Sequence, residues 1–195
     1  MFDARDGALN PMGRPREFDT ETALKGAMDI FWRQGYVATN LPDLLDAMGL
    51  TRGSFYKAFK DKESVYLTTL DHYDREVVSR TVRALQTCEA ETASECLSLI
   101  FAAPADPGRG CFICNAMVEL GPVQPEVKAR TSRMADRLRD AIKGVLIRYG
   151  THDGAEETAD VILHLYFGHQ ALGKAAAGRA DWPQRLAHVL AERSL

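Results

Sequence analysis

The sequence lacks the features by which membrane-spanning, secreted and disulfide-stabilised proteins are usually identified. No apolar run approaches the roughly 20 residues that a membrane-spanning helix needs, and the run at 161–167 is interrupted by His164. The first residues, MFDARDGALNPMGRPRE, contain early aspartates and no apolar segment, so a secretory signal is not expected. The four cysteines have no framework-like spacing, which favours a reducing compartment over a disulfide scaffold. We therefore expect a cytoplasmic protein with reduced cysteines and no membrane partner.

An excess of positive charge is also absent, because the formal net charge is −3. Binding to nucleic acid would therefore have to depend on local charge. One basic cluster lies between positions 52 and 62, and it comprises Arg52, Lys57, Lys60 and Lys62 beside the single acidic residue Asp61. Arg14 and Arg16 form a smaller cluster within residues 1–17, which we expect to be a flexible basic arm.

Strict alternation of apolar and polar residues is missing as well, and apolar residues recur instead at helical spacing, which predicts an all-α fold. We expect helices from Asp19 or Thr20 to Gly35, over 40–48 and 52–59, and from Asp61 to about Leu85. Further helices are expected at about 90–102, 111–120, 125–149, 155–177 and 183–193. The chain thus divides into a small module at 18–62, a linking helix that continues to about 88, and a larger helical bundle within 63–195.

The second and third expected helices form a helix-turn-helix, since two short helices are joined by a tight turn that contains Gly49. Asn40 and Thr51 are residue types that cap the starts of such helices. Phe55 and Phe59 share one face of the third helix and are expected to pack inside the module. The outward positions of this helix carry residues suited to base edges and phosphates, namely Arg52, Gly53, Ser54, Tyr56 and Lys57. A helix of this kind enters the major groove of DNA, so the sequence predicts DNA binding.

These residues resemble the signature of the TetR family of one-component regulators. The similarity is carried by Gly35-Tyr36, Thr39-Asn40, Asp43-Leu44 and the unbroken run MGLTRGSFYKAFKDKE at 48–63. The resemblance implies an N-terminal three-helix helix-turn-helix domain and a C-terminal helical bundle, over 63–195, for effector binding and dimerisation. It also implies a homodimer on a palindromic double-stranded operator. We expect a repressor that a small-molecule effector releases from DNA, with no enzymatic activity, cofactor or metal.

The resemblance assigns DNA contacts to residues of the arm and the module: Arg14, Arg16, Asn40, Thr51, Arg52, Gly53, Ser54, Tyr56, Lys57 and Lys62. Tyr56 and Lys62 are expected to contact phosphates, the latter beside the positive N-terminus of the fourth helix. Taken one by one, these residues also suit a packing tyrosine, a solvated face or a tail, and it is their joint spacing that favours DNA. The sequence departs from the family pattern at Pro42, Leu45 and Ala58, where a phosphate contact or a helix crossing can differ.

The last two expected helices are those through which the resemblance implies dimerisation. Gly168, Ala171 and Gly173 are small enough to let two backbones approach. The expected apolar interface consists of Leu163, Phe167, Leu172, Leu186, Val189 and Leu190. The alternative is that these residues belong to the core of a single chain.

The pair Cys111 and Cys114 opens the short helix at 111–120 and has several interpretations. A zinc site lacks a second cysteine pair, and a dithiol enzyme would need a β-α-β context. Gly110-Cys111 resembles a branch of the family in which members respond to quinones, electrophiles or related aromatics. A helix N-terminus would favour a reactive Cys111 thiolate, while burial as two small hydrophobic residues stays open.

The expected effector pocket is lined by residues of the central helices: Phe101, Cys111, Cys114, Met117, Met134, Tyr166 and His169. Core packing is the alternative for each of them. A different class of function, a cysteine-dependent helical enzyme that acts on electrophiles, would use Cys111 as its nucleophile. The sequence places no histidine or carboxylate at a spacing that would activate this thiol.

Overall fold

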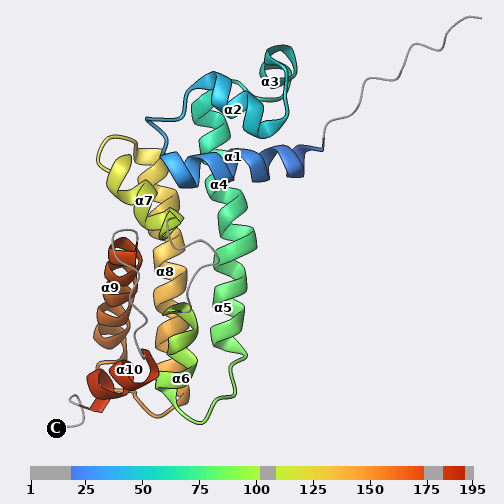
Figure 1. The fold of residues 1–195 in the computed structure, drawn as a ribbon. Coiled ribbons are helices and arrows are strands. Elements are labelled where there is room, and N and C mark those ends of the chain that lie inside the picture. The colour runs from blue at the N-terminus through green and yellow to red at the C-terminus, as the bar shows by residue number, and fades with distance from the viewer. Residues whose placement is uncertain (1–18, 102–108, 174–181, 192–195) are drawn as a thin grey trace, which may run out of the picture.

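The structure is a computed structural model that describes residues 19–101, 109–173 and 182–191 (Figure 1). Within these ranges the chain is helical and contains no strand, which confirms the predicted all-α fold. The expected basic arm at 1–17, with Arg14 and Arg16, lies outside the described residues, as do the expected helix ends at 174–177 and 192–193.

The small module consists of α1 (Thr20–Gln34), α2 (Leu41–Met48) and α3 (Arg52–Ala58). Asp19 caps α1 by accepting the backbone N–H of Glu21, as the sequence predicts. The helices α1 and α2 cross very closely at Gly26, where a Cβ atom would lie only 1.9 Å from the backbone oxygen of Ala47. Because any larger residue would force the helices apart, this crossing requires glycine.

A long continuous helix leaves the module and passes through the molecule (Figure 1). It comprises α4 (Lys62–Tyr73), the π-helical turn η1 (Asp74–Val78) and α5 (Ser79–Gln86), which confirms the helix expected from Asp61 to about Leu85. The π-helical turn was not predicted. Beside it lies α8 (Pro125–Arg148), whose Arg137 pairs with Asp74 and with the Ser79 hydroxyl. The basic face of α8 is thus partly used to bind the long helix.

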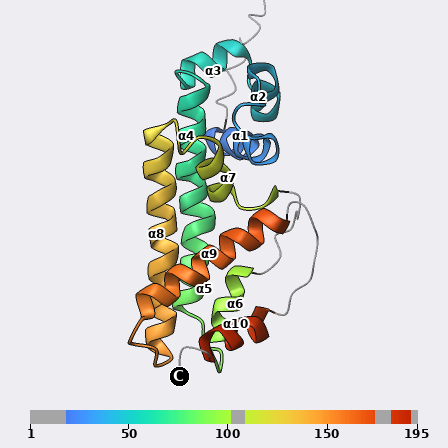
Figure 2. The same cartoon turned by 90° about the vertical axis from the view of Figure 1, so that its left-hand side faces the viewer.

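The remaining helices form the body of the molecule: α6 (Ala93–Ser98) with the 3-10 turn η2 (Leu99–Phe101), α7 (Phe112–Glu119), α9 (Ala155–Gly173) and α10 (Trp182–Ala191). The first of these begins later than expected because Thr92 and Glu95 form a capping box there. Figure 2 shows α9 crossing α8 obliquely, with α6 and α10 together at the end far from the module. In the described ranges, none of the helices has both the length and the apolarity to cross a membrane.

Aromatic packing joins the module to the body. Phe112 of α7 is 1% exposed, and its ring centroid lies 5.9 Å from that of Trp32 in α1. Its ring also lies 5.9 Å from Tyr66 and 5.4 Å from Tyr73, both in α4. Since such pairs add specific ring geometry to apolar burial, module and body share one continuous core.

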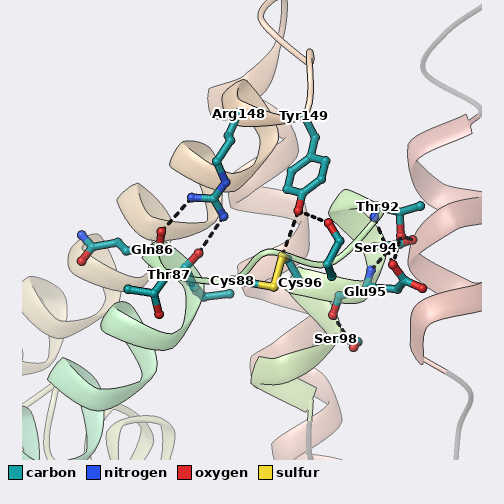
Figure 3. The surroundings of a disulfide bond; sticks show 12 residues. Gln86, Thr87, Cys88, Thr92, Ser94, Glu95, Cys96, Ser98, Arg148 and Tyr149 are labelled. Atoms are coloured by element: carbon teal, nitrogen blue, oxygen red, sulfur yellow. Dashed lines mark hydrogen bonds between the residues drawn. A yellow bond between two sulfur atoms is a disulfide. The ribbon is translucent and has the colours of Figure 1, made fainter.

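The expectation that all four cysteines are reduced is wrong. Cys88, just after α5, forms a disulfide with Cys96 in α6 (Figure 3). The sequence separation of eight fits no framework pattern, but the chain turns back between α5 and α6 and brings the two residues together. Arg148 donates to the carbonyls of Leu85 and Gln86 at the end of α5, and Tyr149 donates to that of Ala90. The end of α8 therefore holds the same connection.

Candidate nucleic-acid interface

The exposed face of α3 is the clearest candidate site in the module. Thr51 caps this helix by accepting the N–H of Ser54 at 3.2 Å, and its hydroxyl also donates to the Ser54 hydroxyl at 3.0 Å. Phe55 is fully buried and Phe59 is half-buried, as the sequence predicts. The residues expected to face DNA are exposed, except for the half-buried Ser54: Thr51, Arg52, Gly53, Tyr56 and Lys57.

Tyr56 is the largest exposed side chain on this helix, with 55% of its surface accessible. Its ring stands edge-on against buried Phe55, with 5.3 Å between the ring centroids, so the exposed side chain is supported by the core of the module. Together with the cationic side chains of Arg52 and Lys57, this face offers hydrogen-bond donors and positive charge. These are the groups that contact phosphates and the acceptor edges of guanine.

Two of the predicted contact residues have structural partners inside the module. The Asn40 side chain accepts the N–H of Asp43 at 2.9 Å and caps α2. Lys62 donates its ammonium group to the carbonyls of Tyr36 at 2.9 Å and Thr39 at 2.8 Å, and lies 4.1 Å from the centre of the Tyr36 ring. The phosphate contact expected of Lys62 stays a prediction, and its observed partners make it first a residue that holds the α1–α2 turn.

The thiol expected to be reactive lies deep in the body. Cys111 precedes α7 and is 3% exposed, and burial raises the pKa of its thiol above the ordinary value. Tyr166 of α9 donates a hydrogen bond to its Sγ at 3.8 Å. Burial therefore favours the interpretation of Cys111 as a small buried residue, because desolvation disfavours the thiolate that a helix N-terminus would stabilise. Cys114 is half-buried.

An aromatic cluster lies next to Tyr166, whose ring centroid is 6.0 Å from that of Phe101. The ring of Phe101 stacks on Trp182 with 3.9 Å between centroids, and His169 lies 4.8 Å from Trp182. Burial, together with the charge of Arg185, lowers the pKa of His169. The indole N–H of Trp182 is buried without a hydrogen-bond partner, which is unusual for a polar group inside a protein.

The structure thus brings together Phe101, Cys111, Tyr166 and His169 of the expected pocket. Of the other expected members, Met134 is 1% exposed and belongs to the core, while Met117 is half-buried. Trp182 belongs to the same cluster but is not among the expected pocket residues, and its sequence signal is weak because a tryptophan at the start of a helix is usually a packing residue. Within the described residues, no group of three or more His, Cys, Asp or Glu side chains is placed to hold a metal.

The expected dimer residues divide into three groups by exposure. Leu163 and Leu186 are buried within the single chain, which favours the core interpretation for them, while Phe167, Val189 and Leu190 are half-buried. Leu172 is 70% exposed, and it continues an apolar stripe of α9 formed by Val161, Leu165, Gly168 and Leu172. These positions are spaced three or four apart, so they share one helix face.

Comparison with known proteins identifies the module. The sequence model of bacterial regulatory proteins, tetR family, matches residues 23–68. HTH-type transcriptional repressor ComR of Escherichia coli is 37% identical over 117 residues, which cover 56% of this chain and 55% of ComR. The uncharacterized HTH-type transcriptional regulator YezE of Bacillus subtilis is 32% identical over 144 residues, which cover 70% of this chain and 73% of YezE.

Solved structures extend the likeness to the whole fold. A cysteine mutant of the TetR family transcriptional regulator CifR, complexed with 26 bp double-strand operator DNA, is 26% identical with a TM-score of 0.72. That match covers 92% of this chain and 97% of the CifR chain. The reduced form of Escherichia coli NemR has a TM-score of 0.74 at 19% identity, over 87% of this chain and 93% of NemR, and shares the fold.

Proposed function

Because the chain belongs to the tetR family of bacterial regulatory proteins, we propose that it is a homodimeric transcriptional repressor in the cytoplasm. Its α3 helices read the two halves of a palindromic operator. The observation that carries this proposal is the exposed face of α3, where Arg52, Tyr56 and Lys57 project from a helix anchored by buried Phe55. ComR, which shares the module, is named a repressor, and CifR is described in complex with operator DNA.

The effector in this proposal is a small aromatic molecule that binds without a covalent bond. The rings of Phe101, His169 and Trp182 lie together in the body, and the buried Trp182 N–H, which has no hydrogen-bond partner, suits a hydrogen-bond acceptor on the ligand. The neutral, buried Cys111 thiol speaks against attack on an electrophile. It also weakens the alternative of a cysteine-dependent enzyme. The hydrogen-bond partner of this thiol, Tyr166, is kept protonated because burial raises its pKa, so it cannot accept the thiol proton.

Selection of bound duplexes from a random DNA pool tests the proposal. We expect recovery of a palindrome whose half-sites lie about one helical turn or a multiple apart, since a two-fold dimer presents two α3 helices. A matched variant, Arg52→Ala with Tyr56→Ala, should recover no enriched sequence while retaining the wild-type circular dichroism spectrum. Enrichment of no sequence by the wild type, or of an isolated half-site alone, would contradict the proposal.

A further inference from the structure

Glu119, the last residue of α7, binds the backbone of the small module formed by α1, α2 and α3, the reading module of the proposed repressor. One carboxylate oxygen accepts the N–H of Tyr36 at 2.9 Å and the other accepts that of Val37 at 2.8 Å. Both residues lie in the turn between α1 and α2. Gly35 precedes them with a φ of 83°, and a Cβ atom there would lie 2.9 Å from both carboxylate oxygens. The turn is thus shaped to receive this carboxylate.

The same turn is held from its other side by Lys62. The carbonyl groups of Tyr36 and Thr39 accept hydrogen bonds from the Lys62 ammonium, while the N–H groups of the turn point to Glu119. The Glu119 carboxylate of the body therefore accepts from N–H groups of this turn, and the Lys62 ammonium at the start of α4 donates to its carbonyl groups. Hydrogen bonds to charged groups are stronger than neutral ones, so the turn is fixed relative to both.

The N-terminal end of α7 is also bound to α1. The indole N–H of Trp32 donates to the carbonyl of Gly110 at 3.0 Å, and Arg109 pairs with Asp29 at 2.6 Å. Between these contacts and Glu119, Phe112 packs against Trp32. The helix α7 is therefore attached to the module at both ends, and the Tyr166 hydroxyl of α9 contacts the Cys111 sulfur at its start.

We propose that Glu119 is the positioning residue that sets the orientation of the reading module on the body. This inference rests on the proposed function, since a fixed orientation places two α3 helices at the spacing of two half-sites. A displacement of α7 would be transmitted to the α1–α2 turn through this carboxylate. The charge alone is not the requirement: the contact needs two acceptors side by side, which a carboxylate has and a carboxamide lacks.

Glu119→Gln is the sharpest variant, because it keeps the size of the side chain but directs an NH₂ group at one of the two backbone N–H donors. We expect its affinity for the palindromic duplex to fall about tenfold, and its affinity for a duplex with a single half-site to stay unchanged. Amide hydrogen exchange at Tyr36 and Val37 should accelerate in parallel. Glu157→Gln, which removes an exposed carboxylate of α9, is the matched control and should behave as wild type.

Two outcomes would overturn the inference. The first is that Glu119→Gln binds the palindrome as tightly as the wild type does. The second is an equal loss on palindrome and half-site, which would show damage inside the module rather than a change of orientation. If the wild type itself selects no DNA, the proposed function fails, and the exchange rates at Tyr36 and Val37 alone decide whether Glu119 holds the turn.

Discussion

Some polar side chains of the reading module form hydrogen bonds within the fold, and others are exposed and available to DNA. Asn40 and Thr51 cap helices with their side-chain oxygens, and Lys62 donates to two carbonyls. Tyr56 and Lys57 remain exposed on α3. A hydroxyl and an ammonium group contribute differently to DNA binding, because only the cation releases counterions from the duplex. Their removal therefore has distinguishable effects.

Tyr56→Phe removes only the exposed hydroxyl of this tyrosine. We expect the affinity for DNA to fall about tenfold, equally for specific and random duplexes, as for loss of roughly 1.5 kcal/mol from a hydrogen bond to the phosphate anion. The slope of log affinity against log salt should stay at the wild-type value. A salt-titrated binding isotherm on both duplexes measures this.

Lys57→Ala serves as the matched comparison, since loss of one phosphate-neutralising cation should reduce that slope by about 0.9. Neither change should lower the midpoint of thermal unfolding appreciably, because both side chains are exposed. Unaltered affinity of Tyr56→Phe, or loss confined to one DNA sequence, would rule out the phosphate contact.

At the scale of helices, much of the fold follows from local sequence. The N-caps at Asp19, Asn40, Thr51 and Asp61 were all predictable, because a cap depends on residues within one turn. The expected start of α6 at about Ala90 was too early, although Thr92 and Glu95 form a capping box, because the Glu-Ala-Glu segment at 89–91 consists of good helix formers. The π-helical turn η1 had no signal in the local sequence, and in the fold its Asp74 pairs with Arg137 of α8.

The candidate site shows the same limit. The outward face of α3 follows from helical spacing alone, whereas the contact of Glu119 with Tyr36 joins residues 83 apart. Its one sequence signal was that Glu119 is the sole charged residue of the helix FICNAMVE. The Cys88–Cys96 disulfide likewise depends on how the chain turns between α5 and α6. Contacts of this kind need the tertiary fold before they can be recognised.

The α5–α6 connection supports a prediction about stability. Replacing Cys88 and Cys96 together by serine removes the cross-link between these helices. We expect the free energy of unfolding of the oxidised protein to fall by about 2–3 kcal/mol, because the unfolded chain regains the freedom of a short loop. Urea unfolding with and without a dithiol reductant measures the change.

Reduction provides an internal control for this effect. With the reductant present, the wild-type protein should lose the same free energy, and the double variant should not change. Cys114→Ser, which alters a thiol outside the disulfide, should respond to the reductant as wild type does. Equal stability of the oxidised wild type and the double variant would contradict a stabilising cross-link.

At the scale of the whole molecule, the long helix and α8 connect the reading module at one end to α6 and α10 at the other (Figures 1 and 2). The helix α9, which carries the apolar stripe, lies in the body at a distance from α3 (Figures 1 and 2). Val161, Leu165 and Leu172 expose 46%, 37% and 70% of their surfaces in the single chain. A row of exposed apolar side chains on one helix face is typical of a protein–protein interface. We therefore place the dimer contact of the proposed repressor on this stripe.

Leu172→Glu should convert the proposed dimer to a monomer, because the pairing of two α9 stripes would bury an unpaired carboxylate at their contact. Light scattering after size exclusion, at micromolar concentration, should give the mass of one chain for this variant and of two for the wild type. Val123→Glu, at a site 72% exposed in the turn before α8, controls for added charge and should remain dimeric. The monomer should bind a palindrome no better than a half-site, since its α3 helix is intact and only the second one is lost. A wild-type mass of one chain would contradict the proposed dimer, and a variant that stays dimeric would place the interface away from the α9 stripe.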